Sequence, residues 1–166
     1  MIKFKKIVDG EFTIFEVTGL PGDTIRTEAE SDRERDKLAA SWYYVKGLTN
    51  TYREDGSLFV TRYPDTFSRE LDVLPKGKYN NIIEEEILYY CMSRTDKAPL
   101  DINIFRKNNG ETFDVAKGNH IFVASGLVTI HSSRGDFDAA APAIINVESE
   151  DVTITSHSKS VSFRLK

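Results

Sequence analysis

Residues 109–130, NGETFDVAKGNHIFVASGLVTI, decide the fold class of this 166-residue chain. Phe113 and Val115 alternate with polar residues, which is typical of a strand with one buried face. Two apolar runs follow, separated by the turn-forming pair Ser125-Gly126. Asn109-Gly110 tolerates the positive φ angles of tight hairpin turns. We therefore expect a hairpin here, whose first strand is LDINIF at 100–105.

The same alternation extends to both ends of the chain. DVTIT at 151–155 and SVSFRLK at 160–166 keep a strict period of two, and EFTIFEV at 11–17 has a similar pattern. NTYREDGSLFVTRY at 50–63 reads as a hairpin around Asp55-Gly56. Short strands joined by Gly, Asn, Asp and Ser turns predict a mainly β chain, folded as an antiparallel β-sandwich or jelly roll.

The length is that of one domain, so the sequence predicts a single β-sandwich over 1–166. The alternative is a division into a less regular half, 1–75, and a jelly-roll-like half, 76–166.

One short helix is expected in the first half. Ser31 and Glu34 match a capping box, and apolar residues then recur at helical spacing up to Gly47. This pattern predicts a helix over Asp32–Lys46. The competing interpretation makes SWYYV, residues 41–45, a strand, because aromatic and β-branched residues favour pleated surfaces.

NNIIEEEILYYCMSR at 80–94 fits either a helix or a strand. Asn81 would cap a helix whose first turn holds Glu84–Glu86. As a strand, the segment would place Ile83 and Cys91 on one face, and the strands expected on both sides favour this structure. In either case Cys91, the single cysteine, lies among apolar residues and is expected to be a buried, unreactive thiol.

Composition excludes several functions. The chain has 22 basic and 26 acidic residues, a net charge of −4, so it lacks the excess of positive charge that dominates nucleic-acid binding.

No apolar run is long enough to cross a membrane, and MIKFKKIVDGEF at the start has no signal-peptide character. We expect a protein made in the cytoplasm. No serine-hydrolase or phosphate-loop motif is present, so no catalytic residue and no cofactor are predicted.

The candidate ligand-binding residues are His120, His131, Asp136 and Asp138. Imidazole and carboxylate groups bind metals, and the two aspartates are spaced to share one strand face. The three histidines of the chain show no His-x-His or His-x-x-x-His spacing, however. The alternative is that these side chains lie at strand ends on the surface.

Tyrosines in the first half are the candidate interface residues. Tyr43, Tyr44, Tyr52 and Tyr63 are of a type enriched at the centres of protein interfaces. An exposed tyrosine at Tyr43 or Tyr44 would indicate a contact surface, whereas buried tyrosines would belong to the core.

Residues 110–154 resemble two groups of proteins. One is the cupin-like small jelly rolls, and the other is the β-sandwich accessory proteins of tailed bacteriophages, such as decoration or tail-associated proteins. The sequence departs from the metal-binding cupin pattern, because His120 is followed by apolar residues and the glutamate of that pattern is missing. The resemblance implies a jelly-roll fold without the usual cupin metal. The matching positions are Gly110, Phe113, Val115, Gly118, Phe122, Val123, Ala124 and Gly126.

Three functions are consistent with these features. The first and preferred one is a non-enzymatic assembly or interaction module, such as a virion accessory protein, that binds a protein partner or itself as a homo-oligomer. The second is a cupin-like enzyme or small-ligand binder with a pocket between its sheets. The third is a small inhibitor that masks a host protein.

Overall fold

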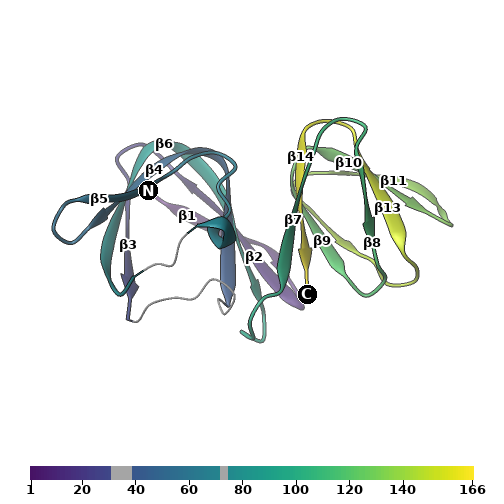
Figure 1. Cartoon of the computed structure of the whole chain (residues 1–166), viewed down its shortest axis with the longest axis horizontal. Coiled ribbons are helices and arrows are strands. Elements are labelled where there is room, and N and C mark those ends of the chain that lie inside the picture. Colours follow the sequence, from purple (N-terminus) through teal and green to yellow (C-terminus); the bar gives the residue numbers. More distant parts are fainter. Residues whose placement is uncertain (31–38, 72–74) are drawn as a thin grey trace. The chain divides into compact units, whose positions relative to one another are not determined.

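A computed structural model describes residues 1–30, 39–71 and 75–166. Over these ranges the chain is antiparallel β, with one 3-10 turn at Ser68–Glu70 and no α-helix. It consists of two compact units, unit 1 (Met1–Leu100) and unit 2 (Asp101–Lys166), both visible in Figure 1. The mainly β prediction is confirmed. The division between the units lies at residue 100, whereas the sequence suggested one domain or a division at residue 75.

Unit 1 is a single six-stranded sheet in which β6 is central. The sheet order is β1-β2-β6-β4-β5, and β3 also pairs with β6, on the side where β2 does. The hairpin predicted around Asp55-Gly56 is present as β4 and β5. The strands are β1 (Lys3–Asp9), β2 (Phe12–Gly19), β3 (Thr24–Ala29), β4 (Ala40–Arg53), β5 (Leu58–Arg62) and β6 (Gly77–Arg94).

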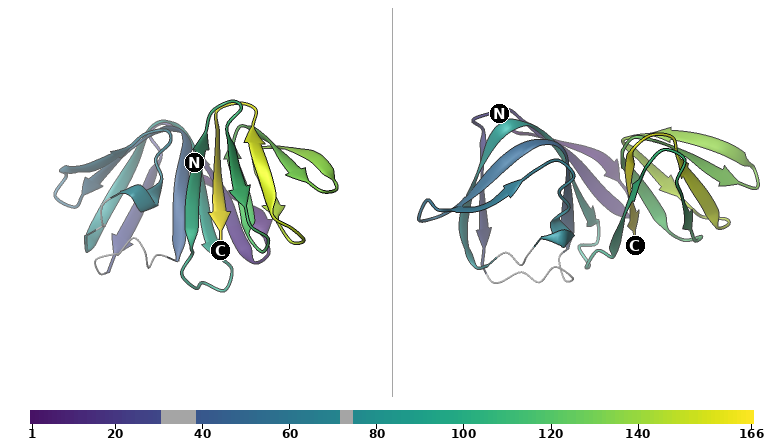
Figure 2. Two further views of the ribbon diagram at one scale, coloured as in Figure 1. Left: turned by 45° about the vertical axis from the view of Figure 1, so that its right-hand side comes forward. Right: turned by 45° about the horizontal axis from the view of Figure 1, so that its top comes forward.

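The long strands β4 and β6 curve strongly, as Figures 1 and 2 show. Gly47, in the middle of β4, has a φ of +90°, and a Cβ at this position would lie 2.3 Å from the carbonyl oxygen of Glu86. Only glycine fits this close approach. The β4–β6 register shifts on either side of Gly47. As a result, Tyr44 before the shift and Thr51 after it lie on the same face of the sheet.

The predicted helix over Asp32–Lys46 is wrong where the structure describes it. Residues 31–38, with the proposed capping box, lie outside the described residues. From Ala40 onward the chain is strand β4, paired with the last part of β6. A helix buries one stripe, but here adjacent residues on both faces, Tyr43 and Tyr44, are buried. Likewise, residues 80–94 form part of strand β6, which confirms the strand interpretation.

Unit 2 is a sandwich of two four-stranded sheets. One has the order β11-β10-β13-β8 and the other β12-β9-β14-β7. The β10–β11 hairpin extends at one side of the unit in both views of Figure 2. The strands are β7 (Ile102–Lys107), β8 (Thr112–Val115), β9 (His120–Ser125), β10 (Leu127–Ser132), β11 (Gly135–Ala140), β12 (Ala143–Asn146), β13 (Val152–Ser156) and β14 (Ser160–Leu165).

The expected hairpin at Asn109-Gly110 is wrong in its pairing. Gly110 does have a positive φ of +85°, as the turn prediction required. Its flanking strands β7 and β8 belong to different sheets, because β7 pairs with β14 and β8 pairs with β13. The turn therefore carries the chain between the two layers of the sandwich. Ser125-Gly126 does the same between β9 and β10.

The interior of unit 2 is apolar. Inward-facing side chains of both sheets form one buried cluster, to which Phe105 adds a ring stacked on Phe113 at 4.5 Å. No helix in the described part of the chain is long and apolar enough to cross a membrane. The buried members of the cluster are Phe113, Val115, Ile121, Val123, Val128, Ile130, Val147 and Ile154.

Candidate functional site

A cavity of about 580 Å³ lies in unit 2, lined by residues of both sheets. The edge strand of each sheet contributes, β11 from one and β12 from the other. Its apolar lining continues into the core cluster, and its rim is polar. Apolar lining residues are Ile130, Phe137, Ala139, Ile144, Ile145, Val147 and Val152, and polar ones include Ser133, Arg134, Asn146, Glu148 and Glu150.

Two hydrogen-bonded pairs organise the polar rim. Glu150 Oε1 accepts hydrogen bonds from the backbone N and the hydroxyl of Ser133, at 2.7 and 2.8 Å. These bonds lower the pKa of the Glu150 carboxyl, so it is ionised at neutral pH. Asn146 Oδ1 lies 2.6 Å from His120 Nδ1. The rim thus presents a fixed carboxylate and a fixed amide beside an apolar floor.

The structure separates the four predicted ligand-binding residues. Asp138 is among the residues that line the cavity, but its side chain shares the outer face of β11 with that of Asp136, where its carboxylate accepts a hydrogen bond from Thr129 at 2.6 Å. His120 is not a lining residue, but it contacts the lining residue Asn146. His131 and Asp136 pair with each other, at 2.9 Å between Nδ1 and Oδ1.

The His131–Asp136 pair lies on the outer face of its sheet. Val128 and Ile130 of the same strand belong to the core, and side chains alternate between the two faces. The other ring nitrogen of His131 is bonded to Thr155 at 2.7 Å. In the described residues no group of three or more His, Cys, Asp or Glu is placed to hold a metal. The candidate His and Asp ligands therefore do not fit the metal that is typical of cupins.

The predicted interface tyrosines also differ in their surroundings. Tyr43 and Tyr44 are buried, with exposed fractions of 3% and 5%. The Tyr43 hydroxyl donates to Asp65 at 2.6 Å. Tyr63 is 58% exposed, and Tyr52 lines a hollow on unit 1. Of the four, Tyr63 alone has the exposure expected of a contact residue.

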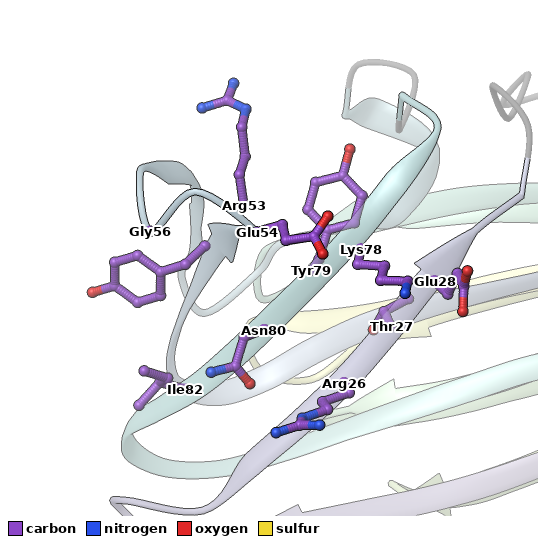
Figure 3. Close-up of a pocket in the computed structure, with 11 residues that line it drawn as sticks. Arg26, Thr27, Glu28, Arg53, Glu54, Gly56, Lys78, Tyr79, Asn80 and Ile82 are labelled. Atoms are coloured by element: carbon purple, nitrogen blue, oxygen red, sulfur yellow. The ribbon is translucent and has the colours of Figure 1, made fainter.

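The hollow on unit 1 has a volume of about 760 Å³ (Figure 3). Arg26 of β3 and Lys78 of β6 bring positive charge to it, and Glu28 and Glu54 bring negative charge. In Figure 3 the Arg53 side chain extends away from the hollow. Its guanidinium instead donates to Ser57 and to the Leu58 carbonyl in the β4–β5 turn. Because side chains of both charges line it, the hollow has no defined chemical preference.

The inward face of unit 1 carries polar and aromatic groups that the sequence analysis did not single out. Arg62 and Thr49 pair across β5 and β4, and Thr51 and Asn81 pair across β4 and β6. Thr51 and Asn81 hydrogen-bond to the guanidinium of Arg62, Trp42 stacks on it, and the phenols of Tyr44 and Tyr89 act on it electrostatically. Period-two alternation in LFVTR was the available signal, since it places Arg62 on the same face as Val60.

The fold is that of the cupin barrel proteins. A cupin 2 conserved barrel domain protein from Leptotrichia buccalis matches with a TM-score of 0.60 and 10% identity, covering 99% of this chain and 88% of that one. An oxalate decarboxylase from Lactobacillus farciminis matches at 0.57 and 7%, covering 99% and 80%. The mannose 6-phosphate isomerase from Bacillus subtilis matches at 0.56 and 9%, covering 96% and 77%.

No protein-family model and no curated protein matches the sequence. The solved structures nevertheless confirm the cupin-like part of the resemblance. They also overturn the preferred function, because the similar structures are cupin-fold proteins that include isomerases and a decarboxylase. The assembly module of the phage type is therefore a wrong prediction, and the alternative, a cupin-like enzyme or small-ligand binder, agrees better with the structures.

Proposed function

We propose that this protein binds a small organic molecule, mostly apolar with one polar end, in the cavity of unit 2. The observation that carries the proposal is the lining: an apolar floor continuous with the core, and a polar rim. Small-molecule sites commonly have this character and volumes of roughly 300–1,000 Å³. Phe137 at this cavity is 55% exposed, so its ring has apolar surface to cover.

The rim supports recognition of the polar end. Arg134 and the Asn146 amide supply hydrogen-bond donors, and Glu150 supplies an acceptor whose position Ser133 fixes. Fixed polar groups at the mouth of an apolar cavity orient a ligand, while the floor contributes most of the affinity. Binding of a small molecule is also in keeping with the fold, since the similar structures include enzymes named for small substrates.

A neutral fluorescent probe, N-phenyl-1-naphthylamine, tests the proposal. We expect its fluorescence to rise in a saturable manner when it is titrated with the protein, because the cavity is apolar. Ala139→Phe should weaken this binding about tenfold, equivalent to about 1.4 kcal/mol. Ala139 lines the cavity, so the added ring occupies the space the probe needs.

Ala140→Phe is the matched control, because Ala140 is exposed and does not line the cavity. It should leave probe binding unchanged. Equal loss in both variants, or no saturable signal with the unmodified protein, would contradict the proposed site.

A further inference from the structure

Arg62 places a guanidinium on the inward face of unit 1. Its Nη1 donates to the hydroxyl of Thr51 and to Asn81 Oδ1, the latter at 3.2 Å. Thr51 and Asn81 are 1% and 8% exposed, so this end of the guanidinium is held inside the unit. The Arg62 guanidinium carbon lies 4.8 Å from the centre of the Trp42 ring. Hydrogen bonds on one edge and a ring on one face fix its orientation.

No carboxylate in the described chain forms an ion pair with Arg62. The titratable groups that act on it are the phenols of Tyr44 and Tyr89. Burial raises the pKa of both phenols, so they are neutral at physiological pH. Burial also lowers the pKa of Arg62, but an arginine remains charged in proteins. Among the described residues, the positive charge of Arg62 inside unit 1 therefore has no negative partner.

The unused edge of the guanidinium is the one suited to a carboxylate. Arg62 Nε is buried and has no hydrogen-bond partner, and Nη2 makes none to the described residues. These two N–H groups point the same way, and they match the two oxygens of a carboxylate in the bidentate geometry that arginine favours. A buried cation without a partner is costly, so its retention requires a compensating role.

Two further donors near Arg62 have no acceptor in the described residues, the indole N–H of Trp42 and the hydroxyl of Tyr89. Three aromatic rings accompany them: Trp42 and Tyr44 are in edge contact at 5.4 Å, and Tyr44 and Tyr89 are 4.8 Å apart. The cluster thus offers donors and flat apolar surfaces together. From these contacts we infer that unit 1 has an anion-binding site, separate from the cavity of unit 2, for a small carboxylate with an aromatic or conjugated body.

A carboxylate fits better than a phosphate ester. A single guanidinium balances the single charge of a carboxylate, whereas a phosphate dianion generally recruits further cations. The described side chains that hydrogen-bond to or stack on Arg62 are Thr51, Asn81 and Trp42, and none of them is a lysine. The surrounding rings favour a planar body over a hydrated sugar.

Benzoate is the simplest probe of this class, and Trp42 is its reporter, because it is the only tryptophan. Titration of the full-length protein with benzoate should change the tryptophan fluorescence in a saturable manner. Benzyl alcohol, a neutral analogue, and inorganic phosphate at matched ionic strength should bind at least about tenfold more weakly, since charge-assisted hydrogen bonds carry the recognition.

Arg62→Gln should weaken benzoate binding about tenfold or more. Arg53→Gln is the matched control: Arg53 also stacks on a ring, that of Phe59 at 4.9 Å, but its guanidinium bonds to the neighbouring turn. It should keep benzoate binding unchanged. Arg62→Lys retains the charge and lacks the bidentate edge, so it provides a second test with a smaller structural change and an intermediate affinity.

Three results would overturn the inference. The first is the absence of a saturable response to benzoate, with circular dichroism showing that the protein is folded. The second is equal binding of benzyl alcohol, which would assign recognition to the rings alone. The third is tighter binding of phosphate, which would remove the carboxylate assignment. Ala139→Phe should not alter benzoate binding at Arg62, so this site and the cavity of unit 2 can fail independently.

Discussion

The two units of this protein are built from the same kind of antiparallel sheet and differ in what faces inward. Unit 2 buries an apolar cluster between its two sheets. The inward face of unit 1 instead combines isoleucines and aromatic rings with Thr51, Asn81 and the charged Arg62. The hydrogen bonds among these polar groups satisfy most of them, and one edge of Arg62 is left over.

The two interiors are therefore expected to contribute differently to the stability of the fold. Burial of apolar area stabilises a fold by about 25 cal/mol per Å², and the apolar cluster of unit 2 contributes in this way. A polar interior contributes less, because each buried polar group must recover in the protein the hydrogen bonds that it loses from water. We therefore expect unit 2 to depend on packing, and unit 1 to depend on backbone geometry and to gain stability where its charge is removed.

Gly47→Ala should give the largest effect, a loss of about 4 kcal/mol in the free energy of unfolding. The new Cβ would meet the backbone of Glu86 at 2.3 Å, and the φ of +90° is strained for alanine. Gly56→Ala is the control, since Gly56 has a φ of +85° but open space around it, and should lose about 1 kcal/mol. Urea denaturation followed by circular dichroism measures both. Equal losses would show that the close β4–β6 approach is unimportant.

Ile154→Ala tests the packing of unit 2. Ile154 is fully buried in the apolar cluster, so the variant should lose about 3 kcal/mol through lost contacts and the cavity that remains. Thr153→Ala, on the outer face of the same strand, removes one hydrogen bond to Asp114 and should lose less than about 1 kcal/mol. The same denaturation measurement distinguishes them. A small effect at Ile154 would mean that the two interiors do not differ in the way the contacts indicate.

Arg62→Met should give the smallest change and the opposite sign, a gain of about 1 kcal/mol in the absence of any ligand. Methionine fills similar space without a charge, and Thr51 keeps its hydrogen bond to Asn81 at 2.6 Å. Thermal unfolding of the two proteins side by side measures the gain. A loss of more than about 1 kcal/mol would show that Arg62 serves stability, which would weaken the contrast between the units.

The sequence predicted the fold class well, because alternation of apolar and polar residues is a local pattern. It failed at two positions for a shared reason. The residues after Ala40 look helical from their apolar spacing, but they form a strand because they pair with the last part of β6, about fifty residues further along the chain. Asn109-Gly110 makes the turn its residues favour, yet the choice of sheet for each neighbouring strand depends on distant partners, β14 and β13.

The candidate site was predicted only in part. Asp138 lines the unit 2 cavity, but its side chain lies on the outer face of β11, where His131 and Asp136 also pair. His120 contacts the rim residue Asn146. The apolar lining of the cavity could not be predicted, because residues such as Ile145 and Ala139 cannot be distinguished from core residues in the sequence. Arg62 was overlooked because arginine is usually exposed, although its place in the strand pattern indicated the inward face.

By itself the sequence determined an antiparallel β protein with turns at its Gly and Asn positions, because strand periodicity and turn chemistry act over a few residues. The tertiary structure alone decided that there are two units, that the turns link different sheets, and that the interiors differ. These features depend on which distant strands pair and on register shifts such as that at Gly47. Such pairings bring Arg62, Trp42 and Asn81 together. These residues are far apart in the sequence, and no local pattern predicts that they are in contact.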